Sequence, residues 1–137
     1  MRHITAIFLL TSIYFQAQAQ SNNSEKDEVI FTTVGTPPSF PGGQDSLKTY
    51  LKRHVVYPQA LLGSGIKEIA FVKLIVEKDG RISGIENMRE CRREFLDEAE
   101  RVAVNMPRWS PAKHAGKPVR CYYVVAIKFC PEGCAGE

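Results

Sequence analysis

The sequence predicts an α+β domain of two layers, in which a three-stranded antiparallel sheet carries helices packed on one face. Apolar residues recur with a period of two in residues 68–77 and 119–129, as they do in half-buried strands. They recur at helical spacing in residues 44–55 and 95–106. Asp79-Gly80 follows the first strand pattern and is a strong hairpin signal, so this strand has an antiparallel partner.

Two helical segments precede the sheet. The first is predicted over residues 44–55, where we expect Asp45 or Ser46 to accept hydrogen bonds from the free N–H groups at the helix start. The second is a short helix in "YPQALLGSG", with Pro58 at its first position and a glycine beyond its end.

The predicted hairpin contains one irregularity. The strand over residues 68–77 alternates cleanly, but the apolar residues of the return strand, over residues 81–90, are out of phase by one. Ser83-Gly84 lies between them, and an extra residue there would restore the alternation. We therefore predict a β-bulge at this pair.

The last part of the chain completes the sheet. Pro107 ends the helix over residues 95–106, Trp109 is expected to fill the core, and the strand Val119–Phe129 follows. If this strand flanks the first, the sheet order is 2-1-3 and both outer strands are edges. An edge strand rich in Tyr, Val and Ile is either an aggregation hazard or a docking site.

The N-terminal residues have the layout of a secretory signal peptide, with a basic start, an apolar run and a small-residue cleavage pattern. The run is shorter than the roughly 20 apolar residues that a membrane-spanning helix needs. We expect a signal peptide at residues 1–19, a flexible leader at 20–39, one domain at 40–130 and a short tail at 131–137. The mature chain is then soluble and lies outside the cytoplasm.

Composition excludes several classes of function. The net charge of +3 is mild and the basic residues are mixed with acidic ones, so we expect no nucleic-acid partner. The spacing of cysteines and histidines offers no two close ligand pairs, so we expect no metal and no cofactor. We also expect no catalysis, because Asp97, Glu98 and Glu100 share a helix surface and no serine has a nucleophile motif.

Four cysteines in an oxidising compartment predict disulfide chemistry, and they allow three complete pairings. Cys130 and Cys134 could close a small loop, or either could reach Cys91. Cys121, on the apolar face of the last strand, is expected to be a buried free thiol. Cys91 precedes two arginines that would lower the pKa of its thiol, as a thiol-redox protein requires.

Several motifs, in this order, closely resemble the TonB C-terminal domain family: "FPGG", "YPQAL", "EKDGRI" and "DEAERVAVNMPRWSPAKHAGKPVR". The resemblance runs from about Phe40 to Phe129. It implies a periplasmic domain of a Gram-negative bacterium that pairs its last strand with the Ton box of an outer-membrane receptor. It also implies that Tyr57-Pro58 is a further contact. Members of the family that couple energy keep a transmembrane anchor and a Pro-rich linker, where this chain is expected to have a signal peptide. We therefore expect that an inner-membrane motor does not drive this chain.

The last strand is therefore the expected partner-binding element. Arg120, Tyr122, Val124 and Ala126 lie on the face that the helices do not cover, and we expect them to contact the partner. Alternatively, the charged residues along this strand only protect an edge from aggregation. An edge-strand homodimer or an envelope interaction protein without a transport role is the alternative function, and a thiol-redox protein is a more distant one.

Overall fold

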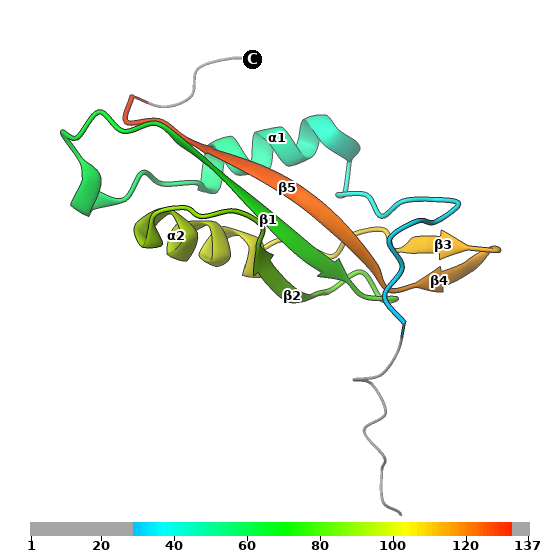
Figure 1. Cartoon of the computed structure of the whole chain (residues 1–137). Helices are drawn as coiled ribbons and strands as arrows, with labels where there is room; N and C mark the ends of the chain where they lie inside the picture. The colour runs from blue at the N-terminus through cyan, green and yellow to red at the C-terminus, as the bar shows by residue number, and fades with distance from the viewer. Residues whose placement is uncertain (1–28, 133–137) are drawn as a thin grey trace, which may run out of the picture.

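The computed structural model of the chain describes residues 29–132 and contains one three-stranded sheet at its centre. The middle strand, β1 (Glu68–Val76), lies between β2 (Ile82–Asn87) and β5 (Cys121–Phe129), and both pairings are antiparallel (Figure 1). The predicted α+β class and the sheet order 2-1-3 are therefore confirmed.

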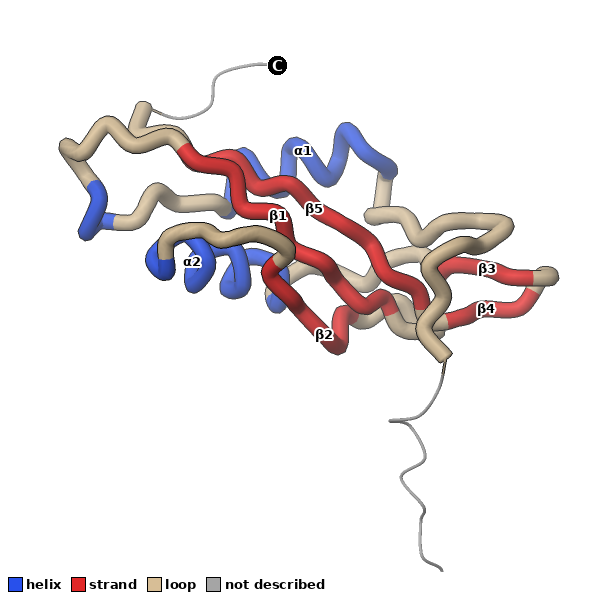
Figure 2. The backbone as a smooth tube through the Cα atoms, in the orientation of Figure 1, coloured by secondary structure: helices blue, strands red, loops and turns tan. Residues whose placement is uncertain are grey.

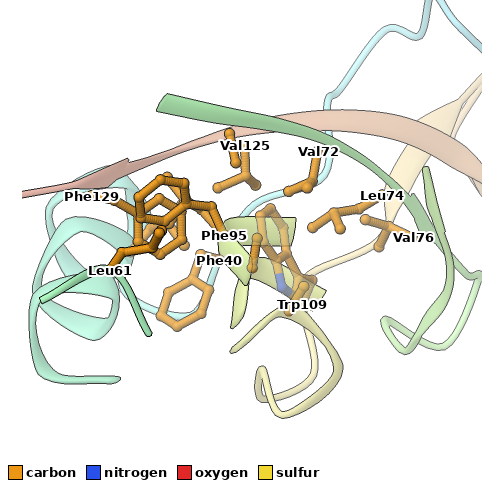
Figure 3. Close-up of a cluster of buried hydrophobic side chains, with 14 residues drawn as sticks. Phe40, Leu61, Val72, Leu74, Val76, Phe95, Trp109, Val125 and Phe129 are labelled. Carbon is orange, nitrogen blue, oxygen red and sulfur yellow. The ribbon is translucent and has the colours of Figure 1, made fainter. Parts of the chain in front are cut away.

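Alternation along the strands creates one covered face and one open face. Except for the half-buried Tyr123, the residues of β1 and β5 on the covered face are at most 2% exposed, and these are Ala70, Val72, Leu74, Val76, Cys121, Val125, Ile127 and Phe129. Figure 3 shows Val72, Leu74, Val76 and Val125 projecting from the sheet toward Phe95 and Trp109. The apolar face of each strand is thus the one that packs against the helices.

Two amphipathic helices cover that face. They are α1 (Gly43–His54), which buries Leu47, and α2 (Arg93–Val104), which buries Phe95, Ala99, Val102 and Ala103. Glu98 joins the helices, since its carboxylate accepts hydrogen bonds from the N–H of Val56 (2.8 Å) and from Arg101 (2.6 Å). Arg101 also donates to the carbonyl of His54 (2.7 Å). The C-terminal end of α1 is therefore fixed to α2.

Two details before the sheet differ from the sequence prediction. α1 begins at Gly43 after Gly42, whose φ of 83° is left-handed, so neither Asp45 nor Ser46 caps the helix. The predicted second helix is a single 3-10 turn, η2 (Gln59–Leu61), and Pro58 precedes it rather than forming its first residue. The helical conformation stops there because Leu62 is extended (ψ 134°) and Gly63 has a left-handed φ of 82°.

The β1–β2 connection forms as predicted. The N–H of Gly80 donates to the carbonyl of Glu77 (2.9 Å), and Gly80 has a φ of 84°. The pairing then shifts so that Gly84 lies opposite Ile75 and Ile82 lies opposite Val76. This shift is the predicted bulge at Ser83-Gly84, and it returns the apolar residues of β2 to the covered face.

A second, smaller hairpin was not predicted. It consists of β3 (Ala112–His114) and β4 (Lys117–Val119), which precede β5 as a separate element (Figure 2). The predicted last strand is thus shorter by two residues at its start, because Arg120 separates β4 from β5. Ala115 and Gly116 form the turn with φ values of 49° and 77°. The sequence hides this turn because alanine rarely adopts positive φ.

Trp109 lies in the core, as predicted, at 3% exposure. Its ring contacts those of Phe40 (centroids 5.6 Å apart) and Tyr123 (4.8 Å apart). Its main-chain N–H donates to the carbonyl of Gly80 (2.8 Å). Trp109 therefore connects the β1–β2 turn to β5 and to the segment before α1.

Residues 29–132 include no helix that is both long and apolar enough to cross a membrane. The expected signal peptide at residues 1–19 lies outside the described residues.

Candidate partner-binding edge

β5 is an outer strand of the three-stranded sheet, and one of its two sides faces away from β1. β1 pairs with its inner side from Phe129, opposite Glu68, to Cys121, opposite Val76 (Figure 2). Its outer side carries main-chain N–H and C=O groups that β1 cannot reach. The candidate site is this outer side, hereafter the β5 edge.

One hydrogen bond shows which residues of β5 face outward. The N–H of Tyr122 donates to the carbonyl of Phe31 (3.1 Å), on the side opposite β1. Successive residues of a strand direct their main-chain N–H and C=O groups to opposite sides. The main-chain groups of Val124, Ala126 and Lys128 therefore point to the same side as those of Tyr122. In residues 29–132, no strand or isolated bridge pairs with these three residues on the outer side. They supply the donors and acceptors that an added strand would need.

Phe31 already occupies the start of the edge. Its N–H donates to the carbonyl of Arg120 (2.9 Å), and together with the bond from Tyr122 this makes a parallel bridge centred on Cys121. Residues 20–39 were predicted to be a flexible leader, and the role of Phe31 was missed. The sequence feature that could have indicated this role is the apolar run Val29-Ile30-Phe31, which follows a polar stretch.

At two of the three open positions, Val124 and Ala126, the side chains are apolar and accessible. Val124 is 46% exposed, Ala126 is also exposed, and both lie on the face away from the helices. The ammonium of Lys73 lies 4.5 Å from the ring centroid of Tyr122 and also pairs with Glu86 (2.6 Å). The Lys73 ammonium and the Tyr122 ring cover each other and are less accessible to a partner. Val124 and Ala126 therefore form the most accessible apolar part of the edge.

Arg120 is engaged within the domain. Its guanidinium approaches the Glu77 carboxylate to 2.9 Å, and the two side chains are 13% and 22% exposed. Its carbonyl accepts the hydrogen bond from Phe31. Of the four expected contact residues on this strand, Arg120 is therefore the one most constrained by its own fold.

Tyr57 and Pro58 lie away from the open positions. The hydroxyl of Tyr57 donates to the carbonyl of Ile66 (2.8 Å), and its ring meets Phe95 edge-on at 5.5 Å. Phe95 in turn contacts Phe129 (4.7 Å between centroids), so Tyr57 lies on the covered side of the sheet, near the end of β5. The structure does not bring Tyr57 and Pro58 onto the open face with Val124 and Ala126.

Burial raises the pKa of both free thiols in residues 29–132, Cys91 and Cys121. Cys91 and Cys121 are free, as expected for Cys121, and the alternative pairings through Cys91 are wrong. Burial and the nearby Glu68 carboxylate raise the pKa of Cys91 to about 11, whereas the adjacent arginines had suggested a lowered pKa. Cys130 is not free, and Cys134 lies outside the described residues.

The described part of the chain contains no group of three or more His, Cys, Asp or Glu side chains that could hold a metal ion.

Comparison with protein families gives one match. A family described as Gram-negative bacterial TonB protein C-terminal matches residues 53–131, which include β1, β2, α2 and β5. A comparison with curated proteins found no match. The matched segment thus contains the whole sheet and the β5 edge.

Proposed function

We propose a receptor-docking role for this chain, which belongs to the TonB protein C-terminal family of Gram-negative bacteria. Domains of this family interact with outer-membrane receptors in the bacterial envelope. In the proposed role, the chain resides in the periplasm and binds a TonB-dependent receptor. The receptor's Ton box, a short extended segment, pairs with the β5 edge as a fourth strand.

The observation that carries the proposal is the set of outward main-chain groups at Val124, Ala126 and Lys128. Strand addition takes its affinity from main-chain hydrogen bonds and its specificity from alternate side chains. About four to six such bonds, at roughly 0.5–1.5 kcal/mol each, must offset the ordering of the peptide. Binding is therefore expected at micromolar concentration or above.

Side chains add a second contribution to the proposed interface. Val124 and Ala126 offer accessible apolar area on the open face, and Tyr122 lies next to Val124. A receptor residue that projects onto this face would bury against them. Arg120 contributes less in this proposal, because its guanidinium is held by Glu77. Tyr57 and Pro58 are proposed only as outlying contacts for a receptor segment longer than the Ton box.

An NMR titration of residues 20–137 with Ton-box peptides tests the proposal. Amide shifts concentrated at Val124, Ala126 and Lys128 are the expected result, because these N–H groups would gain acceptors. An absence of shifts at millimolar peptide would contradict the docking role.

A proline substitution sharpens the test. Ala126→Pro removes an outward N–H without removing a bond to β1, and proline is tolerated on such edges. The matched control is Asn87→Pro at the β2 edge, where the N–H also faces away from β1. We expect Ala126→Pro to weaken peptide binding at least about threefold, and Asn87→Pro to leave it unchanged. Equal effects of both substitutions would show that binding lies elsewhere.

The same edge suits a second copy of the chain, which is the alternative function. Light scattering at low micromolar concentration separates the two cases. A monomer is expected for a receptor-docking domain, whereas a persistent dimer whose β5 amides are protected would favour self-pairing.

A further inference from the structure

The main chain of Phe31 makes the first hydrogen-bonded pairing along the outer side of β5, hereafter the rung at Phe31. It donates to Arg120 (2.9 Å) and accepts from Tyr122 (3.1 Å), in parallel orientation. These are the main-chain groups that a docked strand would need at this position. A partner strand can therefore use the N–H of Tyr122 only if Phe31 moves.

The leader is fixed on both sides of the turn that follows Phe31. Thr36 and Lys113 exchange two main-chain hydrogen bonds (3.0 and 2.9 Å), and Ser39 and Ser110 exchange two more (3.0 and 2.8 Å). The ring of Phe31 also lies 5.1 Å from the ring of His114, at the end of β3. The main-chain pairings at Thr36 and Ser39 hold the leader beside the β3–β4 hairpin, and this keeps the main chain of Phe31 next to the start of β5.

We propose that Phe31 is the register-determining residue of the β5 edge. The inference rests on the proposed docking function and specifies which part of the edge a partner receives. With Phe31 in place, a partner strand pairs with Val124, Ala126 and Lys128 and ends before the rung of Tyr122. The edge therefore accepts a short extended segment whose register is limited at the start of β5, because a strand shifted by two residues in that direction meets the Phe31 main chain.

The proposal has a consequence for affinity as well as for register. The rung at Phe31 withholds one main-chain donor, the N–H of Tyr122, from the partner. Freeing that rung should strengthen binding of a peptide long enough to use it by about two- to tenfold, the value of one additional net hydrogen bond. A peptide that spans only Val124 to Lys128 should gain nothing.

Hydrogen exchange of the free protein tests the first part of the proposal without a partner. We expect the amide of Tyr122 to exchange at least about tenfold more slowly than those of Val124, Ala126 and Lys128. Phe31→Pro removes the N–H that binds Arg120 and should accelerate exchange at Tyr122. Equal exchange at Tyr122 and Val124 in the unaltered protein would overturn the proposal.

Two control variants isolate the main chain of Phe31. Phe31→Ala keeps both main-chain hydrogen bonds and removes only the ring, so Tyr122 should stay protected. Thr33→Pro places a proline in the same leader at an exposed residue, and it should also leave Tyr122 unaffected. Acceleration in Thr33→Pro equal to that in Phe31→Pro would assign the effect to general loosening of the leader and would overturn the role of Phe31.

A titration with a long and a short Ton-box peptide tests register. In the unaltered protein, we expect shifts to begin at Val124, and in Phe31→Pro we expect them to extend to Tyr122, with tighter binding of the long peptide only. Identical register and affinity in both proteins would refute the proposal while leaving the docking function intact. No binding to either protein would instead refute the docking function and the register with it, and the exchange data would still decide whether Phe31 protects Tyr122.

Discussion

The guanidinium of Arg120 lies 2.9 Å from the carboxylate of Glu77. The two side chains thus connect the turn between β1 and β2 to the start of β5. Glu77 also accepts a hydrogen bond from the hydroxyl of Ser83, at the bulge. Arg120 was expected to face a partner, but its charge is compensated within the domain. The pair therefore contributes to holding together the strand ends at which the β5 edge begins.

This pair should contribute measurably to stability. Because both side chains are largely shielded from water, we expect Arg120→Ala to lower the free energy of unfolding by about 1.5–3 kcal/mol. A double-mutant cycle with Glu77→Gln should give a coupling of about 1 kcal/mol or more. Urea unfolding at neutral pH measures both. The exposed pair Arg93–Asp97 is the control and should couple by only about 0.3–0.5 kcal/mol. Equal coupling in the two pairs would contradict the assignment.

Gly80 should be intolerant of any side chain. A Cβ placed there would lie 1.9 Å from the carbonyl oxygen of Trp109, and the residue has a positive φ. Gly63 has a similar φ of 82° but open space around it, so Gly63→Ala carries the backbone strain alone, about 1–2 kcal/mol. We expect Gly80→Ala to cost about 1–3 kcal/mol more than Gly63→Ala, measured by thermal unfolding. Equal costs would mean that Trp109 moves aside freely.

Glu98 should make stability depend on pH in the acid range. Burial alone would raise the pKa of Glu98, but hydrogen bonds from Arg101 and from the N–H of Val56 lower it overall. A lowered folded-state pKa means that the stabilisation is complete above the unfolded pKa of about 4.3 and is lost as the pH falls through the folded value.

The variant Glu98→Gln tests this dependence. At pH 7, we expect it to reduce the free energy of unfolding by about 1–2 kcal/mol, since the charge-assisted bonds to Arg101 and Val56 weaken. Urea titrations at pH 7 and below pH 4 should show the difference between variant and parent shrinking with acidity. A difference that is constant with pH would show that the carboxylate charge is not what stabilises the contact.

Cys91 should react slowly with alkylating agents at neutral pH. Its pKa of about 11 leaves little thiolate, and thiolate is the reacting form. Iodoacetamide labelling followed by mass spectrometry should show a rate that increases steadily between pH 7 and pH 10. The variant Glu68→Gln should label faster, because the Glu68 carboxylate contributes to the raised pKa. Rapid labelling at pH 7 would reopen the thiol-redox alternative.

Sequence patterns predicted the elements that pack through alternate residues. The period of two in β1 and β5, the Asp79-Gly80 turn and the bulge at Ser83-Gly84 all appear in the structure. Each follows from the chain's own local chemistry and from burying one strand face, so it can be derived without knowing what lies beside the strand. The expected contact positions Val124 and Ala126 are exposed at the open edge for the same reason.

By itself, the sequence determined the α+β class and the apolar face of each element, because hydrophobic periodicity is a local property that burial makes decisive. Only the tertiary structure decided how much of the β5 edge is open. The pairing of Phe31 with Arg120 and Tyr122 joins residues about ninety positions apart through main-chain groups, which every residue type but proline carries in full, so no side-chain pattern encodes it. The hairpin turn at Ala115-Gly116 was likewise fixed by its surroundings, since pairing of β3 with β4 and of β3 with the leader holds alanine at a φ it seldom adopts.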